Sequence, residues 1–305
     1  MPKLHHLRDF VAIARAGSAR SAARSLGLTQ PALTRSLQEL EIELDAGLFE
    51  RHARGMVLTA AGERFLVRAQ AALEEVRRGF EEAAQAKGRM QGSVAVALSS
   101  AVVLAMLPAA YGPFRRDCPD VRLRVVESLF PAAEPKLRDG RLDFYMGPRP
   151  ESGLGNSYRV DLLFHNERQV VGRKGHPLRH ARSIEELLEA EWIVTGLRER
   201  IEEEFEEQFT ALGLRTPKSP IVAESMLALL SLLATGDALA FLPRQWTDTP
   251  LLKGLVEPIT VAEPLMAPDI VLVTRAKLPL TPAAERLSTL LQRAAGQPFQ
   301  GSAGR

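Results

Sequence analysis

The 305-residue sequence predicts an α+β protein of several domains, and three observations support this fold class. Short helical patterns and a hairpin pattern fill roughly the first sixty residues, one long helical pattern follows, and strand patterns alternate with helical ones from about residue 92 onward. We therefore expect a winged helix-turn-helix domain at 1–58, a linker helix at 59–88 and an α/β domain at 92–298.

The first domain is expected to contain three short helices, because each helix end carries a suitable residue. Gly17 and Gly27 end the first two helices, where glycine accepts a left-handed backbone turn. Ser18 and Thr29 are the predicted N-caps of the second and third helices, and Pro31 lies in the first turn of the third. Two helices joined by a tight glycine turn predict a helix-turn-helix.

The third helix is predicted to have one buried and one exposed face. Its leucines follow steps of four, three and four residues, which places on one stripe Leu33, Leu37, Leu40 and Leu44. The opposite face carries the candidate DNA-reading residues Gln30, Pro31, Thr34, Arg35 and Gln38. Arginine pairs with guanine, glutamine with adenine, and threonine with a phosphate or a thymine methyl group, whereas Pro31 is expected to shape the helix start. The alternative is an ordinary solvated helix face.

The segment 49–59 predicts a hairpin wing with Gly55 at its turn. Arg51, His52 and Arg54 lie at the predicted tip, where the two arginines suit contacts with phosphates or the minor groove. Residues 1–38 contain six basic residues and one acidic residue, whereas the next twelve contain five acidic and no basic residues. This distribution favours a positive face against DNA and an acidic back, the alternative being a chance imbalance in a solvated stretch.

The long helical pattern at 59–88 predicts a contact between two chains. Steps of four and three residues place on one seam Ala69, Leu73, Val76, Phe80 and Ala83. Thirty residues span about 45 Å as a helix, which is too long for the helix to pack only against the small domain before it. We therefore expect a homodimer formed through this helix, and the alternative is packing on its own domain.

The rest of the sequence predicts an α/β domain, which a hinge at 88–92 precedes. The expected strands are 93–98, 121–127, 142–146, 168–172, 192–194, 221–222, 239–242 and 270–274, and the expected helices are 102–116, 131–138 and 282–294. Because strands and helices alternate from 93 to 146, we expect an α/β sheet with parallel strands there, and a second alternating region follows it. The polar, glycine-rich segment 296–305 is expected to fray.

With these residues assembled, the chain resembles the LysR-type transcriptional regulators over essentially its whole length. The most specific match is the segment GSARSAARSLGLTQPALTRSLQELEIELDAGLFERHARGMVLTAAG. Weaker matches are FRRDCPDVRLRVVE, LRDGRLDFYMG and KGHPL. Within the family, ESMLALL, LPRQ and LPLTPAAERL are similar to the subgroup that regulates toluenesulfonate degradation.

The resemblance implies a DNA-binding transcriptional regulator that dimerises through its linker helix. Its effector-binding domain would consist of two subdomains, at about 92–163 with 268–298 and at about 164–267, like a periplasmic solute-binding protein. A small anionic or aromatic effector would bind between the subdomains and modulate binding to promoter or operator DNA. A homotetramer is the expected assembly, and RNA polymerase is a candidate partner.

The candidate effector-binding residues follow strands, because ligands of α/β sheets bind beyond the carboxyl ends of strands. They are Ser99, Ser100, Ser128, Phe130, Arg149 and Thr195. The hydroxyl groups and helix-end amides near Ser99 would suit a carboxylate or sulfonate. The alternatives are helix capping by the serines, core packing of Phe130 and a solvated loop for Arg149.

Several classes of protein are disfavoured by the sequence. Cys118 is the only cysteine, so no intramolecular disulfide is expected. The N-terminus has no long apolar segment and no window predicts a membrane span, so we expect a cytoplasmic protein. We expect no metal, cofactor or catalytic site, because the sequence lacks HExxH, CxxC, GxSxG and P-loop motifs. A solute-binding protein and a cytoplasmic enzyme with an accessory DNA-binding head are the alternatives.

Overall fold

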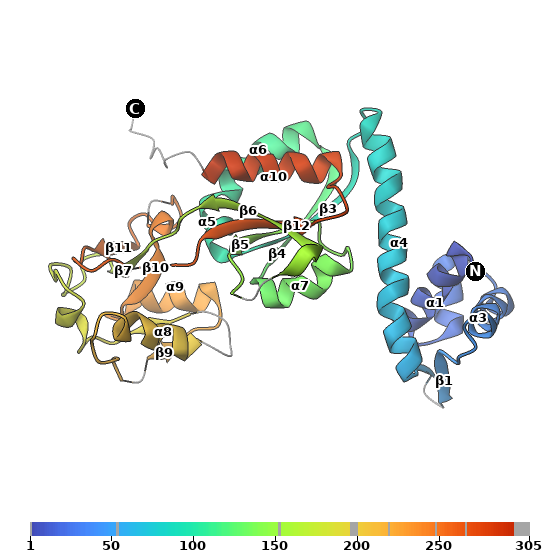
Figure 1. The fold of residues 1–305 in the computed structure, drawn as a ribbon, viewed down its shortest axis with the longest axis horizontal. Helices are drawn as coiled ribbons and strands as arrows, with labels where there is room; N and C mark the ends of the chain where they lie inside the picture. The colour runs from blue at the N-terminus through green and yellow to red at the C-terminus, as the bar shows by residue number, and fades with distance from the viewer. Residues whose placement is uncertain are drawn as a thin grey trace. The chain divides into compact units, whose positions relative to one another are not determined.

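The computed structural model describes residues 2–52, 55–151, 154–195, 201–218, 220–247, 249–265 and 267–295. The chain forms two compact units. The first comprises Met1–Gly92 with Pro135–Leu142, and the second comprises Ser93–Glu134 with Asp143–Arg305. Figure 1 shows a helical N-terminal part and a larger part built on β-sheets.

The first unit contains the predicted helices and the hairpin. Its elements are α1 (Leu4–Ala16), α2 (Ala19–Leu26), α3 (Gln30–Leu44), β1 (Phe49–His52), β2 (Gly55–Leu58) and α4 (Ala60–Ala86). Ser18 accepts a hydrogen bond from the Ser21 amide and Thr29 from the Ala32 amide, so both predicted N-caps are confirmed. Gly17 and Gly27 have φ values of 66° and 65°, which confirms the left-handed turns after α1 and α2.

The wing is joined to the helices through backbone contacts. Strands β1 and β2 pair antiparallel, with Phe49 opposite Leu58 and His52 opposite Gly55. The Met56 amide donates to the Gly17 carbonyl at 2.8 Å, so the end of α1 holds β2. This contact fixes the wing beside the helix-turn-helix.

Helix α4 begins at a tightly built joint with the same domain. Thr59 caps it by accepting a hydrogen bond from the Gly62 amide at 3.0 Å, and the Thr59 hydroxyl also donates to the Gly47 carbonyl at 2.8 Å. A Cβ atom on Gly62 would lie 2.1 Å from the Leu48 carbonyl oxygen. Glycine is therefore required here for the close approach of α4 to the chain that leads into the wing.

The predicted seam of α4 divides into two parts. Ala69 is buried and Leu73 is half-buried, and both pack on the hydrophobic core of α1, α2 and α3. Val76 and Phe80 are 38% and 75% exposed, and Ala83 is exposed too. The alternative of packing on its own domain thus holds for the first half of the seam, because Ala69 and Leu73 belong to the apolar cluster of that domain.

The segment 135–142 belongs to the first unit through α4. Arg78 of α4 is buried, and its guanidinium donates to the carbonyls of Gly140 and Leu142, the latter at 3.0 Å. A guanidinium is a strong donor to carbonyl oxygens that a chain turn leaves without helical partners. These contacts account for the grouping of 135–142 with α4.

The second unit contains a five-stranded sheet in the order β4-β3-β5-β12-β6. The strands are β3 (Gln91–Leu98), β4 (Asp120–Glu127), β5 (Phe144–Pro148), β6 (Tyr158–Phe164) and β12 (Ile270–Arg275). The helices of this part are α5 (Ser100–Ala105), α6 (Leu107–Asp117), α7 (Phe130–Arg138) and α10 (Pro282–Ala295). Helices α6 and α10 pack side by side (Figure 1).

The remainder of the second unit is built on two smaller sheets. One has the order β10-β7-β11 and the other pairs β8 with β9. The elements are β7 (Arg168–Arg173), β8 (Ile193–Val194), α8 (Ile201–Thr210), β9 (Ile221–Val222), α9 (Met226–Thr235), β10 (Ala240–Pro243) and β11 (Val256–Ile259). The described part of this unit also contains three short 3-10 helices, η1 (Gly155–Ser157), η2 (Glu185–Leu187) and η3 (Arg244–Trp246).

The sheets contain both parallel and antiparallel pairs. Strands β3 and β5 are parallel, as are β8 and β9, but β12 runs antiparallel to β5 and β6. Strand β7 is antiparallel to both of its neighbours. The prediction of parallel strands for 93–146 is therefore confirmed for the pair β3 and β5. The antiparallel pairs involve β12, β7 and their neighbours.

The predicted helix 102–116 is in fact two helices. Helix α5 ends before Met106, and α6 starts at Leu107 with Pro108 in its first turn. Proline lacks an amide proton and fits the start of a helix better than its interior. Strand β6, strand β11 and helices α8 and α9 were not predicted. None of the described helices is long and apolar enough to cross a membrane.

We predict that Gly62→Ala lowers the stability of the first unit by about 1–3 kcal/mol, because the added methyl group would clash with the Leu48 carbonyl. Thermal unfolding of the full-length protein, followed by circular dichroism, measures the effect. Gly79→Ala on the same helix is the matched control, since a Cβ there meets nothing within 4 Å. This control should be neutral or stabilising. Equal melting temperatures for the two variants would contradict the crowded joint.

Candidate nucleic-acid interface and effector site

Helix α3 presents the predicted DNA-reading residues on its solvent side. Leu33, Leu37 and Leu40 are buried in the core of the first unit, which turns the opposite face outward. Four of the five predicted reading residues on this helix are exposed, namely Gln30, Pro31, Arg35 and Gln38, and Thr34 is half-buried. The sequence pattern therefore placed these side chains on one accessible face, and their contacts with DNA stay a prediction.

A buried carboxylate fixes α3 against α1. Asp9 is 2% exposed, and its Oδ2 accepts a hydrogen bond from the Ser36 hydroxyl at 2.7 Å. Its Oδ1 accepts from the Arg8 guanidinium at 2.8 Å. Hydrogen bonds to an ionised group are stronger than neutral ones, so this contact sets the position of α3. Sequence reasoning missed Asp9 and Ser36, and an acid within an apolar helical stripe was the available signal.

Arg35 is held by a neighbour on its own helix. Its Nε donates to Glu39 Oε1 at 3.0 Å, and Glu39 Oε2 lies 3.3 Å from Nε2 of the buried His6 on α1. The hydrogen bond from Arg35 lowers the pKa of the Glu39 carboxyl below its ordinary value, so Glu39 is ionised at neutral pH. Sequence analysis did not single out Glu39 or His6 as functional.

A second glutamate of α3 positions the entry to the wing. Glu41 Oε1 accepts the Leu48 amide at 2.7 Å and the Phe49 amide at 3.4 Å. Of the predicted wing arginines, Arg51 pairs through its backbone with Met56. The side chain of Arg51 and the whole of Arg54 lie outside the described residues. The contact from Glu41 nevertheless fixes where strand β1 starts.

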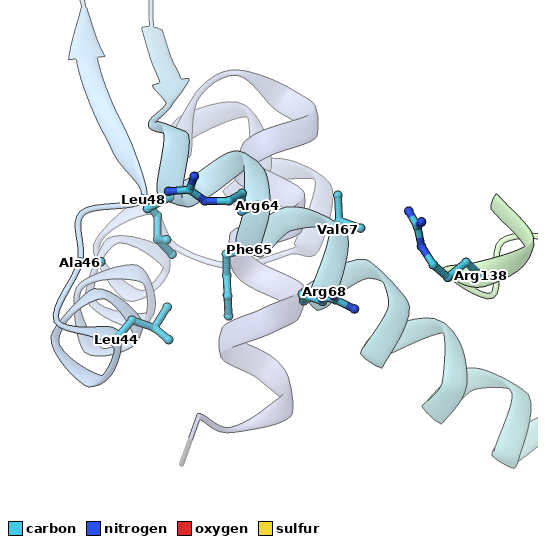
Figure 2. Close-up of a pocket in the computed structure, with 9 residues that line it drawn as sticks. Leu44, Ala46, Leu48, Arg64, Phe65, Val67, Arg68 and Arg138 are labelled. Atoms are coloured by element: carbon cyan, nitrogen blue, oxygen red, sulfur yellow. The ribbon is translucent and has the colours of Figure 1, made fainter. Parts of the chain in front are cut away.

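A pocket of about 730 Å³ lies beside the end of α3 and the start of α4. Its lining residues are Leu44, Ala46, Leu48, Ala61, Arg64, Phe65, Val67, Arg68 and Arg138. Figure 2 shows the apolar side chains between α3 and α4, with arginines around them. None of the six predicted effector-binding residues lines this pocket, so it is not the predicted effector site.

Three predicted effector-binding serines lie where strands β3 and β4 end. Ser99 is 3% exposed, its amide donates to the Met146 carbonyl at 2.9 Å, and its Oγ has no hydrogen-bond partner among the described residues. The Ser128 amide donates to the Leu98 carbonyl at 3.1 Å. The Ser100 hydroxyl donates to the Glu127 carboxylate. The backbone contacts therefore bring these serines to one end of the sheet.

Ser99 packs closely against Gly147 of strand β5, a position where a larger residue would not fit. A Cβ atom on Gly147 would lie 2.9 Å from Ser99 Cβ and 2.4 Å from the Tyr145 hydroxyl oxygen. Burial raises the pKa of Tyr145 well above its ordinary value, and its hydroxyl donates to the Pro148 carbonyl at 3.1 Å. Tyr145, Gly147 and Glu127 were not predicted to belong to this region.

The other three predicted effector-binding residues are not joined to the serines by the described contacts. Phe130 is 5% exposed, and its ring packs against Tyr145 and Tyr158 with centroids 5.3 and 5.8 Å apart, which favours the alternative of core packing. Arg149 is exposed, and its amide donates to the Asp269 carbonyl at 2.7 Å. Thr195 is half-buried at the end of β8.

Helix α5 connects the serines to the part of the second unit that is built on the two smaller sheets. Ala101 and Leu104 pack against the hydrophobic core formed by Val171, Leu229 and Trp246, among others. The helix that starts at Ser100 therefore has one end at the five-stranded sheet and apolar side chains in the neighbouring core.

Comparison with protein families gives two matches. Residues 4–63 match the family model described as bacterial regulatory helix-turn-helix protein, lysR family. Residues 87–296 match the model described as LysR substrate binding domain. Together the two models cover the helix-turn-helix, the wing, the first residues of α4 and nearly all of the second unit.

Individual relatives agree with the family models. The chain is 33% identical over 176 residues to the uncharacterized HTH-type transcriptional regulator YdcI of Escherichia coli, a match that spans 58% of this chain and 57% of the relative. It is 27% identical over 288 residues to the HTH-type transcriptional regulator GalR of Pseudomonas putida, covering 94% and 72% of the two chains. Full-length CbnR, solved in complex with its target DNA, superposes with a TM-score of 0.68 at 22% identity, covering 96% of this chain and 99% of CbnR.

Proposed function

Because the chain belongs to the LysR family of bacterial DNA-binding transcriptional regulators, we propose that it reads promoter DNA through α3 and that a small anionic effector modulates this binding. Members of the family are transcriptional regulators and not enzymes. The working divisions are a DNA-binding head at 1–58, a linker helix at 59–88 and an effector-binding domain at 92–298. DNA binding places the protein in the cytoplasm.

The DNA-reading proposal is carried by the exposed face of α3. Arg35 has an 82% exposed side chain, and it is flanked by Gln30, Thr34 and Gln38 on the same helix. Such a set offers donors to guanine and both donors and acceptors to adenine. Arg51 and Arg54 of the wing would add phosphate contacts, whose contribution falls as salt concentration rises. Pro31 would set the start of the reading helix.

We expect Arg35→Ala to weaken binding to a selected target duplex by about 1–3 kcal/mol, because a bidentate contact to guanine would be lost. Binding to a scrambled duplex should fall much less. Fluorescence anisotropy with both duplexes measures the two affinities, and Lys87→Ala, an exposed change after the end of α4, serves as the control. Equal losses on both duplexes would contradict base reading by Arg35.

The dimer proposal rests on the second half of the α4 seam. Val76 and Phe80 are exposed apolar side chains one helical turn apart, and a second copy of α4 would cover them. Two-fold pairing would place two heads on inverted half-sites. Pairing of dimers into a tetramer and contact with RNA polymerase are further parts of the proposal.

Phe80→Ala should weaken the dimer at least about tenfold, because each protomer loses the burial of one aromatic side chain. Analytical ultracentrifugation of the full-length protein over a concentration series measures the dissociation constant. Glu82→Ala is the control, since Glu82 is also exposed on α4 but lies on the opposite side of the helix from Phe80. If Phe80→Ala dissociates no more readily than Glu82→Ala, the seam is not the dimer contact.

The effector proposal is carried by the unpartnered, buried Ser99 hydroxyl. Ser100 and Ser128 lie beside it, and Thr195, Arg149 and Phe130 complete the predicted set. The Glu127 carboxylate, which accepts from Ser100, would repel a bare anion. An acid that also carries a hydroxyl or amino group would satisfy both Glu127 and the serines. The likeness to regulators of toluenesulfonate degradation stays a prediction from the sequence.

Screening small aromatic and aliphatic acids, with and without hydroxyl or amino substituents, by thermal shift should identify an acid that raises the melting temperature. We expect Ser99→Ala to reduce that stabilisation, because binding to the folded state alone stabilises by RT ln(1 + [L]/Kd). Ser231→Ala, an exposed serine of α9, is the control. A stabilisation that survives Ser99→Ala and Ser100→Ala together would show that the effector binds elsewhere.

A further inference from the structure

A chain of three side chains runs from the buried side of α1 to the DNA-facing side of α3. His6 has a 3% exposed side chain, Glu39 is 44% exposed and Arg35 is 82% exposed. His6 Nε2 lies 3.3 Å from Glu39 Oε2, and Glu39 Oε1 accepts a hydrogen bond from Arg35 Nε at 3.0 Å. Glu39 therefore faces His6 with one carboxylate oxygen and Arg35 with the other.

The stability of α3 does not explain why Glu39 holds Arg35. An ion pair four residues apart on a helix is weak when exposed, and it is weaker still when the acid follows the base. Here the acid follows the base, and the pair lies near the middle of α3. The carboxylate of Glu39 also places a negative charge next to the candidate DNA-reading face, and this charge opposes phosphate binding.

The geometry instead suits an arginine prepared for a base. Arginine has five N–H donors in a planar fork. Glu39 accepts only the donor on Nε, and the two terminal nitrogens of Arg35 have no partner among the described residues. Those nitrogens are suited to the paired acceptors O6 and N7 of guanine. The hydrogen bond from Nε restricts rotation of the guanidinium without occupying the reading atoms.

Glu39 lies at the interface between α1 and α3, where it contacts His6 without a hydrogen bond of regular geometry. His6 and Asp9 lie three residues apart on α1, and Ser36 and Glu39 lie three residues apart on α3. The 2.7 Å hydrogen bond between Ser36 and Asp9 fixes the register of the two helices. Side chains three residues apart share a helix face, so the contact between His6 and Glu39 belongs to the same fixed interface.

We propose that Glu39 is a positioning residue that sets the base specificity of Arg35. This inference rests on the proposed DNA-reading role of Arg35. A prepared guanidinium loses less conformational freedom on binding guanine than a free one does, which favours the correct base. The same carboxylate repels phosphates, so it lowers the affinity for DNA of any sequence.

The test uses the full-length protein and two duplexes: one selected by the wild-type protein from a random pool, and a scrambled duplex of equal composition. Glu39→Gln should bind the scrambled duplex more tightly and should lower the ratio of selected to scrambled affinity roughly three- to tenfold. Glu43→Gln removes the same charge from α3 four residues later. This matched control should raise affinity for both duplexes alike and leave the ratio unchanged.

A double-mutant cycle separates the two roles. If Glu39 acts through Arg35, Glu39→Gln should leave the ratio unchanged in an Arg35→Ala background, and selection with Glu39→Gln alone should relax preference at one base position. The inference is overturned if Glu39→Gln and Glu43→Gln give the same ratio, or if Glu39→Gln lowers it equally without Arg35. If Arg35→Ala itself leaves the ratio unchanged, the DNA-reading role of Arg35 fails instead.

Discussion

The buried hydrogen bond between Asp9 and Ser36 is the constraint on which the geometry of the head depends. The carboxylate is removed from water, so it must keep its donors, and these come from the Ser36 hydroxyl and the Arg8 guanidinium. This requirement locks α3 against α1 in one register. The exposed face of α3, the link from His6 to Arg35 and the glutamate that holds the wing are all consequences of that register.

The second unit follows a different rule, because its candidate site is made at strand ends and not on one helix face. Ser99 and Ser128 are brought together by backbone pairing of β3 with β5 and by the contact of Ser128 with Leu98. This arrangement leaves the buried Ser99 hydroxyl without a hydrogen-bond partner among the described residues, which supports the proposed effector site there. Helix α5 starts at this site, and its Ala101 and Leu104 pack into the hydrophobic core of the neighbouring part of the unit.

The head could be predicted almost completely from the sequence, because its information is local. Caps at Ser18 and Thr29 and glycines at 17 and 27 define the helix ends without reference to the rest of the chain. Helix α9 was missed because MLALLSLLAT is apolar on every side and has no helical period. The antiparallel entry of β12, the burial of Phe130 and the placement of His6 of α1 beside Glu39 of α3 depend on contacts between distant segments.

The crowded joint at Gly62 makes α4 a lever for the head. Thr59 ties the start of α4 to Gly47, and Gly62 lies against the Leu48 carbonyl, so the head and the first turns of α4 turn as one body. Helix α4 has 27 residues and is therefore about 40 Å long. A tilt of about 5° at its far end would move the head by about 3.5 Å, close to the spacing of successive base pairs. If α3 reads DNA as proposed, a small rotation of this helix would move the head along DNA by about one base pair.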